Sequence, residues 1–367
     1  MENEAPIHDR TPPPGEVPDE PSAAKRWAGH LLKLALAFLG IYLTWRLVAG
    51  IDWSDLSRRV AGASWPLLAL AAVLLLARYS LWDWRFRLAA RRVAETRTGP
   101  ALGFFVLMAS AALNLITPSA RLIGGLMRAR YFAHAAARPF GMMYGVVLYD
   151  QVAHHVVMST CTCLAVVAAA FAMGRTALGL GALAVLAAAA VAAVLWSRRR
   201  GTGENPLVRF LARRAEAAQG RSQRLYTHGH EAVGIFVRLL SDVPLRGHAA
   251  LLGAGFYTLN ILAQWLVFLA LGQRVDPMVT LIGVSLGAAA GMLTGTPGGI
   301  GTTEAAMVAS FTALGMDPVD AAAGSLLFRG LHYAGVLAVG LPALAGLEIQ
   351  MSRGAAAPAD GAPRAEP

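Results

Sequence analysis

Long apolar runs dominate the chain and alternate with short polar or basic segments. Six runs approach or exceed the roughly 20 mostly apolar residues that a helix needs to cross a bilayer. They occupy residues 28–49, 65–82, 140–172, 177–196, 248–271 and 319–348. Each run predicts one full membrane span, so the expected fold class is an all-α polytopic membrane protein.

A further apolar run, at residues 278–314, is broken near its middle by a proline and three closely spaced glycines. The break reads Thr296-Pro-Gly-Gly-Ile-Gly-Thr-Thr-Glu304. Each arm is short for a full span, and irregular backbone at membrane depth persists only inside protein or beside a wet cavity. This pattern favours a re-entrant helical hairpin. The alternative is a tight turn outside the membrane between two short helices.

The residue types in this break each have a physical role. Pro297 lacks an N–H and should end the first arm. Thr302 or Thr303 is expected to cap the next helix, leaving Glu304 in its first turn, where a carboxylate stabilises the helix dipole. A second role for Glu304 is substrate or proton handling in a cavity. The glycines that permit positive φ and close backbone approach are Gly298, Gly299 and Gly301.

A similar break occurs earlier in the chain. The apolar residues 101–116 lead into Thr117-Pro118, followed by a Gly-Gly pair and Arg128. The Thr-Pro dipeptide recurs 179 positions later, at Thr296-Pro297. Short hydrophobic segments interrupted by Gly or Pro often mark the substrate site of a transporter. We therefore predict two re-entrant hairpins, one in each half of the chain.

The distribution of arginine predicts the topology. The segments after residue 82 and after the first Thr-Pro break are strongly basic, as is the loop 197–247. The positive-inside rule places all three in the cytoplasm, which requires segment 101–135 to enter and leave from that side. The result is about six full spans and two hairpins in an inverted-topology repeat with an eight-segment core. A conventional eight-span count would also leave both termini cytoplasmic.

The predicted domain organisation follows from these assignments. Residues 1–26 and 352–367 are expected to be disordered tails, because they are rich in proline, alanine or charge. Residues 27–351 form the transmembrane domain. Its halves are residues 28–172 and 177–348, and its basic cytoplasmic loop is expected to form amphipathic helices attracted to anionic lipid.

Composition supports this reading. The chain has 367 residues, of which 56% are hydrophobic and 15% charged, and a formal net charge of +10. Such a composition is typical of helical membrane proteins and argues against an ordinary soluble enzyme. The positive charge indicates anionic lipid headgroups as partners, and we expect no nucleic-acid partner. No metal-binding or nucleotide-binding motif occurs, so we expect no metal and no cofactor.

Ionisable residues within the spans are candidate site residues, because a charge at the centre of a transmembrane helix costs about 2.5–3.5 kcal/mol on insertion scales. Asp150 and Arg329 are 179 positions apart, the offset that relates the two Thr-Pro breaks. We expect both to face a central cavity, where Arg329 attracts a lipid phosphate and Asp150 balances it directly or through His154. A purely structural pair is the alternative. Arg78, near the end of its span, is expected to snorkel towards the headgroups.

The predicted substrate-binding set combines these charges with the residues of the two breaks. It consists of Arg121, Arg128, Asp150, His154, Pro297, Gly298, Gly299, Gly301, Glu304, Arg329 and Tyr333.

The second break also resembles a known family. The segment from Pro297 to Ala305, followed by Gly315, Arg329 and Tyr333, looks like the transmembrane domain of lysylphosphatidylglycerol synthases, which also occurs alone as a flippase-like domain. The resemblance covers about residues 28–350. Its match to the first break is looser, because no aspartate follows the glycines there. The first-half residues that fit are Pro118, Gly124, Gly125 and Arg128.

The resemblance implies a multi-pass protein of the bacterial inner membrane that translocates or scrambles a phospholipid or lipid-linked intermediate between leaflets. A membrane-embedded enzyme or an accessory subunit of lipid or glycan envelope synthesis is the alternative. Two-domain members of the family add a soluble aminoacyl-transferase domain after the membrane part, and we expect that activity to be absent here. A lipid- or glycan-modifying enzyme is a further candidate partner.

Overall fold

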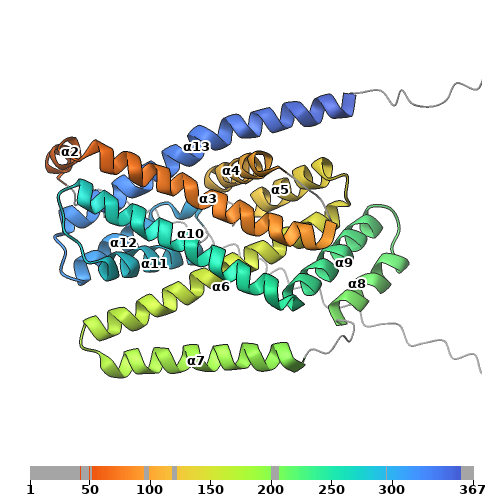
Figure 1. The fold of residues 1–367 in the computed structure, drawn as a ribbon, viewed down its shortest axis with the longest axis horizontal. Helices are drawn as coiled ribbons and strands as arrows, with labels where there is room; N and C mark the ends of the chain where they lie inside the picture. Colours follow the sequence, from red (N-terminus) through yellow and green to blue (C-terminus); the bar gives the residue numbers. More distant parts are fainter. Residues whose placement is uncertain are drawn as a thin grey trace, which may run out of the picture.

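The structure, a computed structural model, describes Tyr42, Ala49 and residues 52–94, 99–117, 122–199, 206–294 and 296–356. All regular secondary structure in these residues is helical, which confirms the all-α part of the predicted fold class (Figure 1). The predicted first span and both tails lie wholly or largely outside the described residues. The helices are α2 (Trp53–Ala61), α3 (Trp65–Ala94), α4 (Pro100–Ile116), α5 (Leu122–Ala135), α6 (Phe140–Ala172), α7 (Thr176–Arg199), α8 (Pro206–Ala217), α9 (Gly220–Ser241), α10 (Val243–Ala270), α11 (Pro277–Thr294), η1 (Pro297–Gly299), α12 (Thr302–Ala313) and α13 (Pro318–Ala356).

Five of these helices are long and apolar enough to cross a membrane: α3, α6, α10, α11 and α13. Helix α4 and the first part of α7 are apolar but shorter. The chain is therefore a multi-pass membrane protein. Helix α11 has 18 residues, which is at the lower limit for a span, whereas the sequence pattern had suggested an arm too short to cross.

Helices α3 and α10 form an antiparallel pair at the centre of the bundle (Figure 1). The N–H of Ser64, just before α3, donates to the carbonyl of Ala270 at the end of α10, at 2.8 Å. At the other end of the pair, Arg92 Nε lies 3.5 Å from Asp242 Oδ2. The pair is thus tied at both of its ends.

The other core helices surround this pair in a reciprocal arrangement. Helix α4 packs against α5 and α13, whereas α11 packs against α12 and α6. Helix α5 also contacts α6, and α12 also contacts α13. The shorter helix that follows each break is therefore held between its preceding arm and the long helix that follows it.

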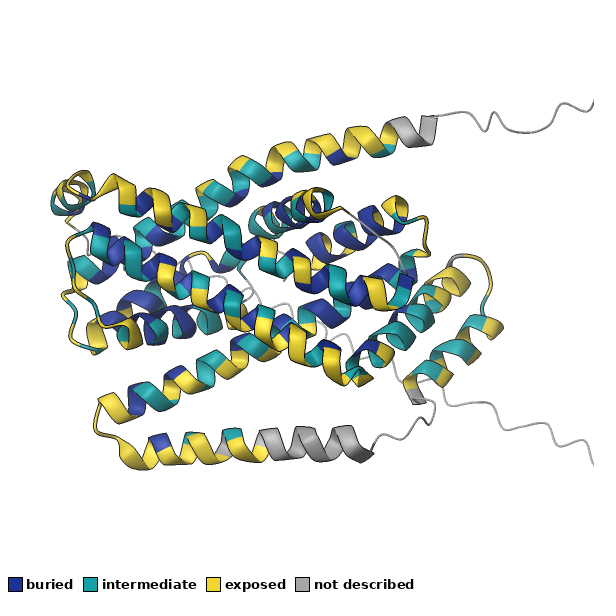
Figure 2. Ribbon diagram, viewed as in Figure 1, coloured by how far each residue is buried: buried dark blue, intermediate teal, exposed yellow. Residues whose placement is uncertain are grey.

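Helices α7, α8 and α9 lie outside this core (Figures 1 and 2). Helix α7 packs against α6 and exposes Leu178, Leu180 and Leu183, as expected for a surface that faces lipid. Helix α9 packs against α6 and α8, and it buries Ala232 and Leu239 while Arg224 and Arg238 are exposed. The basic loop thus forms helices with one apolar and one polar face, as the sequence predicted.

Close packing between α4 and α13 generates a stability prediction. A Cβ at Gly340 would overlap the Met108 carbonyl oxygen and lie 2.7 Å from Ala112 Cβ. Gly340→Ala should destabilise the folded protein by about 1–3 kcal/mol, because the two backbones would have to separate. Gly346 lies on the same helix with open space around it, so Gly346→Ala is the matched control. Equal melting temperatures for the two purified variants would contradict the prediction.

Candidate functional site

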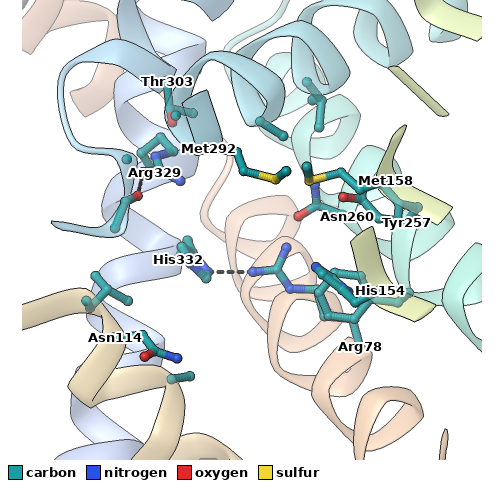
Figure 3. A pocket seen from close by; sticks show the side chains of 18 of the residues that line it. Arg78, Asn114, His154, Met158, Tyr257, Asn260, Met292, Thr303, Arg329 and His332 are labelled. Atoms are coloured by element: carbon teal, nitrogen blue, oxygen red, sulfur yellow. Dashed lines mark hydrogen bonds between the residues drawn. The ribbon is translucent and has the colours of Figure 1, made fainter. Parts of the chain in front are cut away.

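A cavity of about 240 Å³ lies where both helix breaks meet the core helices. Its wall includes Thr117 from the first break and Gly298 and Gly299 from the second. Most of the remaining polar wall comes from the long helices α3, α6, α10 and α13 (Figure 3). Its charged, amide and aromatic lining residues include Arg78, Tyr79, Trp82, Asn114, His154, Phe256, Tyr257, Asn260, Arg329 and His332.

The second break has the backbone conformation that its glycines predicted. Gly298, Gly299 and Gly301 have φ values of 58°, 70° and 87°, a left-handed region that other residues adopt only under strain. A Cβ at Gly299 would also lie 3.1 Å from the Gly291 backbone. Both conformation and space therefore require glycine in this turn.

The predicted threonine cap of the following helix is wrong. Helix α12 begins at Thr302, so Gly301 occupies the N-cap position. Glu304 performs the capping instead, because its Oε2 accepts the backbone N–H of Gly301 at 2.7 Å. This contact is the carboxylate half of a capping box, and it fixes Glu304 at the edge of the cavity wall.

Glu304 also binds the long helix that follows the break. Arg329 Nε donates to Glu304 Oε1 at 2.7 Å, and Arg329 Nη2 donates to the Gly298 carbonyl at 2.6 Å. The Tyr333 hydroxyl bonds Arg329 and donates to Glu304 Oε1 at 3.1 Å. Arg329 therefore ties the irregular turn to α13, and its charge is balanced locally.

A second charged cluster lies in the first half of the chain. Asp150 Oδ1 accepts from Arg85 Nε at 2.7 Å, and Asp150 Oδ2 lies 2.8 Å from Arg128 Nη1 and 2.7 Å from Trp82 Nε1. Asp150, Arg85 and Arg128 are almost completely buried. The cluster joins α3, α5 and α6, and its two arginines against one carboxylate leave one positive charge.

The predicted pairing of Asp150 with Arg329 is therefore not formed, because each residue has closer partners. Asp150 binds arginines from α3 and α5, and Arg329 binds the carboxylate at the start of α12. Of the predicted set, the structure joins Arg128 to Asp150 and Gly301 to Glu304. It also joins Gly298, Glu304 and Tyr333 to Arg329. Arg121 lies outside the described residues.

His154 lies on the cavity wall, where it stacks on Trp82 with ring centroids 4.5 Å apart. Pro297 begins the short helix η1, which turns the chain towards this wall.

Sequence reasoning missed Trp82 and Arg85. Both were assigned to the end of a span and the loop beyond it, but α3 continues to Ala94 and carries them into the core. A signal for both residues was available in the sequence. Trp82 and Arg85 are three positions apart, so they share one helix face, and a later span carries a carboxylate, Asp150, that needs partners.

Arg78 also differs from its expected role. It is buried on the cavity wall and does not snorkel. Its Nη2 lies 2.5 Å from His332 Nδ1 (Figure 3), and its guanidinium carbon lies 5.1 Å from the Phe256 ring centroid.

Two tyrosine–histidine pairs line the cavity. Tyr79 stacks on His332 with ring centroids 6.4 Å apart, and Tyr257 packs on His154 at 6.0 Å. Tyr257 follows Tyr79 by 178 positions, and His332 follows His154 by the same number. Each half of the chain thus contributes one tyrosine and one histidine to these two pairs.

The first break is held by polar contacts between α4 and α5. Ser110 Oγ donates to the Gly124 carbonyl at 2.8 Å, and Asn114 Oδ1 accepts the Gly124 N–H at 3.1 Å. A Cβ at Gly124 would lie 2.5 Å from the Ser110 carbonyl oxygen. The glycine therefore permits the close approach of the two helices.

Comparison with known protein families matches residues 30–340 to the family described as the lysylphosphatidylglycerol synthase TM region. No curated protein matches the chain. Among the residues that the structure describes, no three His, Cys, Asp or Glu side chains are grouped to hold a metal ion.

The Asp150 cluster generates a second prediction. Asp150→Asn should destabilise the protein by about 3–5 kcal/mol, because Arg85 and Arg128 would remain buried without a carboxylate. Asp276→Asn is the matched control, since Asp276 is exposed and caps Met278 through an oxygen that asparagine keeps. Thermal melting of both variants in one detergent measures the difference. An Asp150→Asn protein that melts with the control would show that this cluster does not hold the core.

Proposed function

Because the chain belongs to the lysylphosphatidylglycerol synthase transmembrane-region family, we propose that it moves a phospholipid or lipid-linked intermediate between the leaflets of a bacterial inner membrane. The observation that carries this proposal is the polar cavity inside an otherwise apolar bundle, walled by both helix breaks. A lipid headgroup needs polar partners to cross the hydrocarbon core. The cavity offers guanidinium, imidazole, carboxamide and hydroxyl groups for that purpose, while the tails remain in the bilayer.

The packing supports an internal repeat made of α3–α6 and α10–α13. Val243 lies 178 positions after Trp65, and Pro318 lies 178 positions after Phe140. In this repeat α3, α4, α5 and α6 correspond to α10, α11, α12 and α13. The contact of α4 with α13 therefore corresponds to a contact of α11 with α6, and the structure contains both. The antiparallel α3 and α10 are related by the same exchange. These halves are narrower than those expected from the sequence, and they leave α7–α9 as an insertion between them.

In this proposal the repeat has inverted topology, and each break forms a re-entrant hairpin. Helices α5 and α12 have 14 and 12 residues, fewer than the roughly 20 that a full span needs. The exposed arginines of α8 and α9 face the cytoplasm by the positive-inside rule. Both termini are then cytoplasmic.

The hairpin proposal predicts that positions 297–301 lie at membrane depth. Single cysteines placed across 293–307, in a protein with Cys161 and Cys163 replaced by serine, should resist bulky membrane-impermeant thiol reagents near the turn. A single cysteine at the exposed position Arg274, which lies outside the membrane in this topology, provides the labelled control. Free labelling of every position from 293 to 307 from outside the membrane would reject a re-entrant turn.

The lipid-translocation proposal predicts that filling the cavity stops transport. Ala288 lines the cavity from α11, and Ala288→Phe should lower the rate of lipid movement towards that of protein-free liposomes. Ala69→Phe is the matched control, since Ala69 is exposed on α3. The rates come from a leaflet-resolved assay of tail-labelled lipids in proteoliposomes, with folding checked by the melting temperature. Unchanged transport by a folded Ala288→Phe protein would exclude this cavity as the route.

A further inference from the structure

Arg78 differs from the other arginines of the core in having no carboxylate partner. Arg85 and Arg128 bind Asp150, and Arg329 binds Glu304. Among the described residues, no Asp or Glu lies within ion-pair distance of Arg78, although Arg78 is only 5% exposed. A buried guanidinium without a counter-ion is costly, so this position favours an anionic ligand.

The contacts that Arg78 does make leave its charge uncompensated. Its Nε donates to the Leu75 carbonyl at 3.2 Å, and its Nη2 contacts the His332 ring nitrogen. The rings of Tyr79 and Phe256 lie 5.2 and 5.1 Å from the guanidinium carbon. These contacts orient a planar donor group at the cavity wall, and such a group suits the oxygens of a phosphate.

The region around Arg78 as a whole also carries net positive charge. Among the described residues, Arg78 and Arg329 line the cavity, Arg85 and Arg128 are buried next to it, and the carboxylates paired with these arginines are Asp150 and Glu304. The nearby Asp83 and Arg87 form a separate neutral pair at 2.6 Å. The cavity and the layer of side chains around it therefore carry net positive charge, and both carboxylates of that layer are already engaged by arginine.

Asn260 supplies a second, independent indication of a ligand. The residue is 9% exposed and lines the cavity from α10, yet its Oδ1 has no hydrogen-bond partner in the protein. A buried amide oxygen without a partner is uncommon in folded proteins. Figure 3 shows Asn260 and Arg78 facing the same space, so a ligand there could accept bonds from Arg78 and donate a hydroxyl to Asn260.

We propose that this cavity binds a lipid headgroup that carries one phosphate and free hydroxyl groups but no net positive charge. Arg78 binds the phosphate, and Asn260 Oδ1 accepts a headgroup hydroxyl. The assignment rests on the proposed lipid function and specifies its substrate class. It excludes lysylphosphatidylglycerol as the preferred cargo, because that headgroup carries two ammonium groups against one phosphate and none of the described residues that line the cavity carries a carboxylate to receive them.

Lipid binding to the purified full-length chain tests the assignment. The probes are dioctanoyl phosphatidylglycerol, its lysyl ester and inorganic phosphate, and the readout is the concentration dependence of the melting temperature. Phosphatidylglycerol should bind more tightly than its lysyl ester. Arg78→Gln should weaken phosphatidylglycerol binding about tenfold to a hundredfold, the range expected for loss of a charge-assisted hydrogen bond, whereas Arg78→Lys should retain more of it. Arg91→Gln, at an exposed position of the same helix, is the matched control.

A second variant tests the assignment independently if Arg78→Gln does not fold. Asn260→Asp lowers the cavity charge by one, so it should weaken phosphatidylglycerol binding and narrow or reverse the preference over the lysyl ester. Tighter binding of the lysyl ester to the unmodified protein would overturn the assignment. Unchanged phosphatidylglycerol binding in folded Arg78→Gln, or stabilisation by inorganic phosphate equal to that by the lipid, would also overturn it.

The binding assay separates this assignment from the proposed function. Selective binding without movement between leaflets in proteoliposomes would refute lipid translocation and leave the headgroup site intact. Translocation of lipids with no preference between phosphatidylglycerol and its lysyl ester would support the function and refute the site.

Discussion

Charge compensation in a dry interior is the constraint on which the rest of this structure depends. Two buried carboxylates compensate arginines, one from a long helix and the other from a short helix. In the first half, Arg128 on the short helix after the break binds Asp150 on the following long helix. In the second half, Glu304 on the short helix binds Arg329 on the following long helix. The short helix after each break is therefore anchored by an ion pair to the helix that comes next, with the signs reversed.

This anchoring explains how broken helices persist within an apolar bundle. The turn at residues 297–301 leaves backbone groups without helical partners, and Glu304 and Arg329 bind two of them directly, the Gly301 N–H and the Gly298 carbonyl. At the first break, Ser110 donates to the Gly124 carbonyl and Asn114 accepts the Gly124 N–H. The cavity can then be polar at its centre without leaving these backbone groups unsatisfied.

Local features of the site could be predicted from the sequence because they depend on neighbouring residues. The positive φ angles of the glycines and the position of Glu304 in a first turn both follow from short-range chemistry. The partners of these charges could not be predicted in the same way. Arg85 reaches Asp150 across 65 positions, and Arg78 reaches His332 across 254. Such contacts depend on how α3 and α13 are placed in space, which hydropathy alone does not determine.

The reversed signs of the two ion pairs also bear on how such a protein arises. If the two halves descend from one duplicated segment, identical copies would have carried the same residue at the positions of Asp150 and Arg329. Those copies could have exchanged hairpins freely between subunits of an ancestral dimer. Once one copy placed its acid on the long helix and the other on the short helix, each hairpin became matched to its own partner. A chimaera that exchanged the two short helices would place Glu304 beside Asp150 and Arg128 beside Arg329, so each short helix is matched by charge to the long helix of its own half.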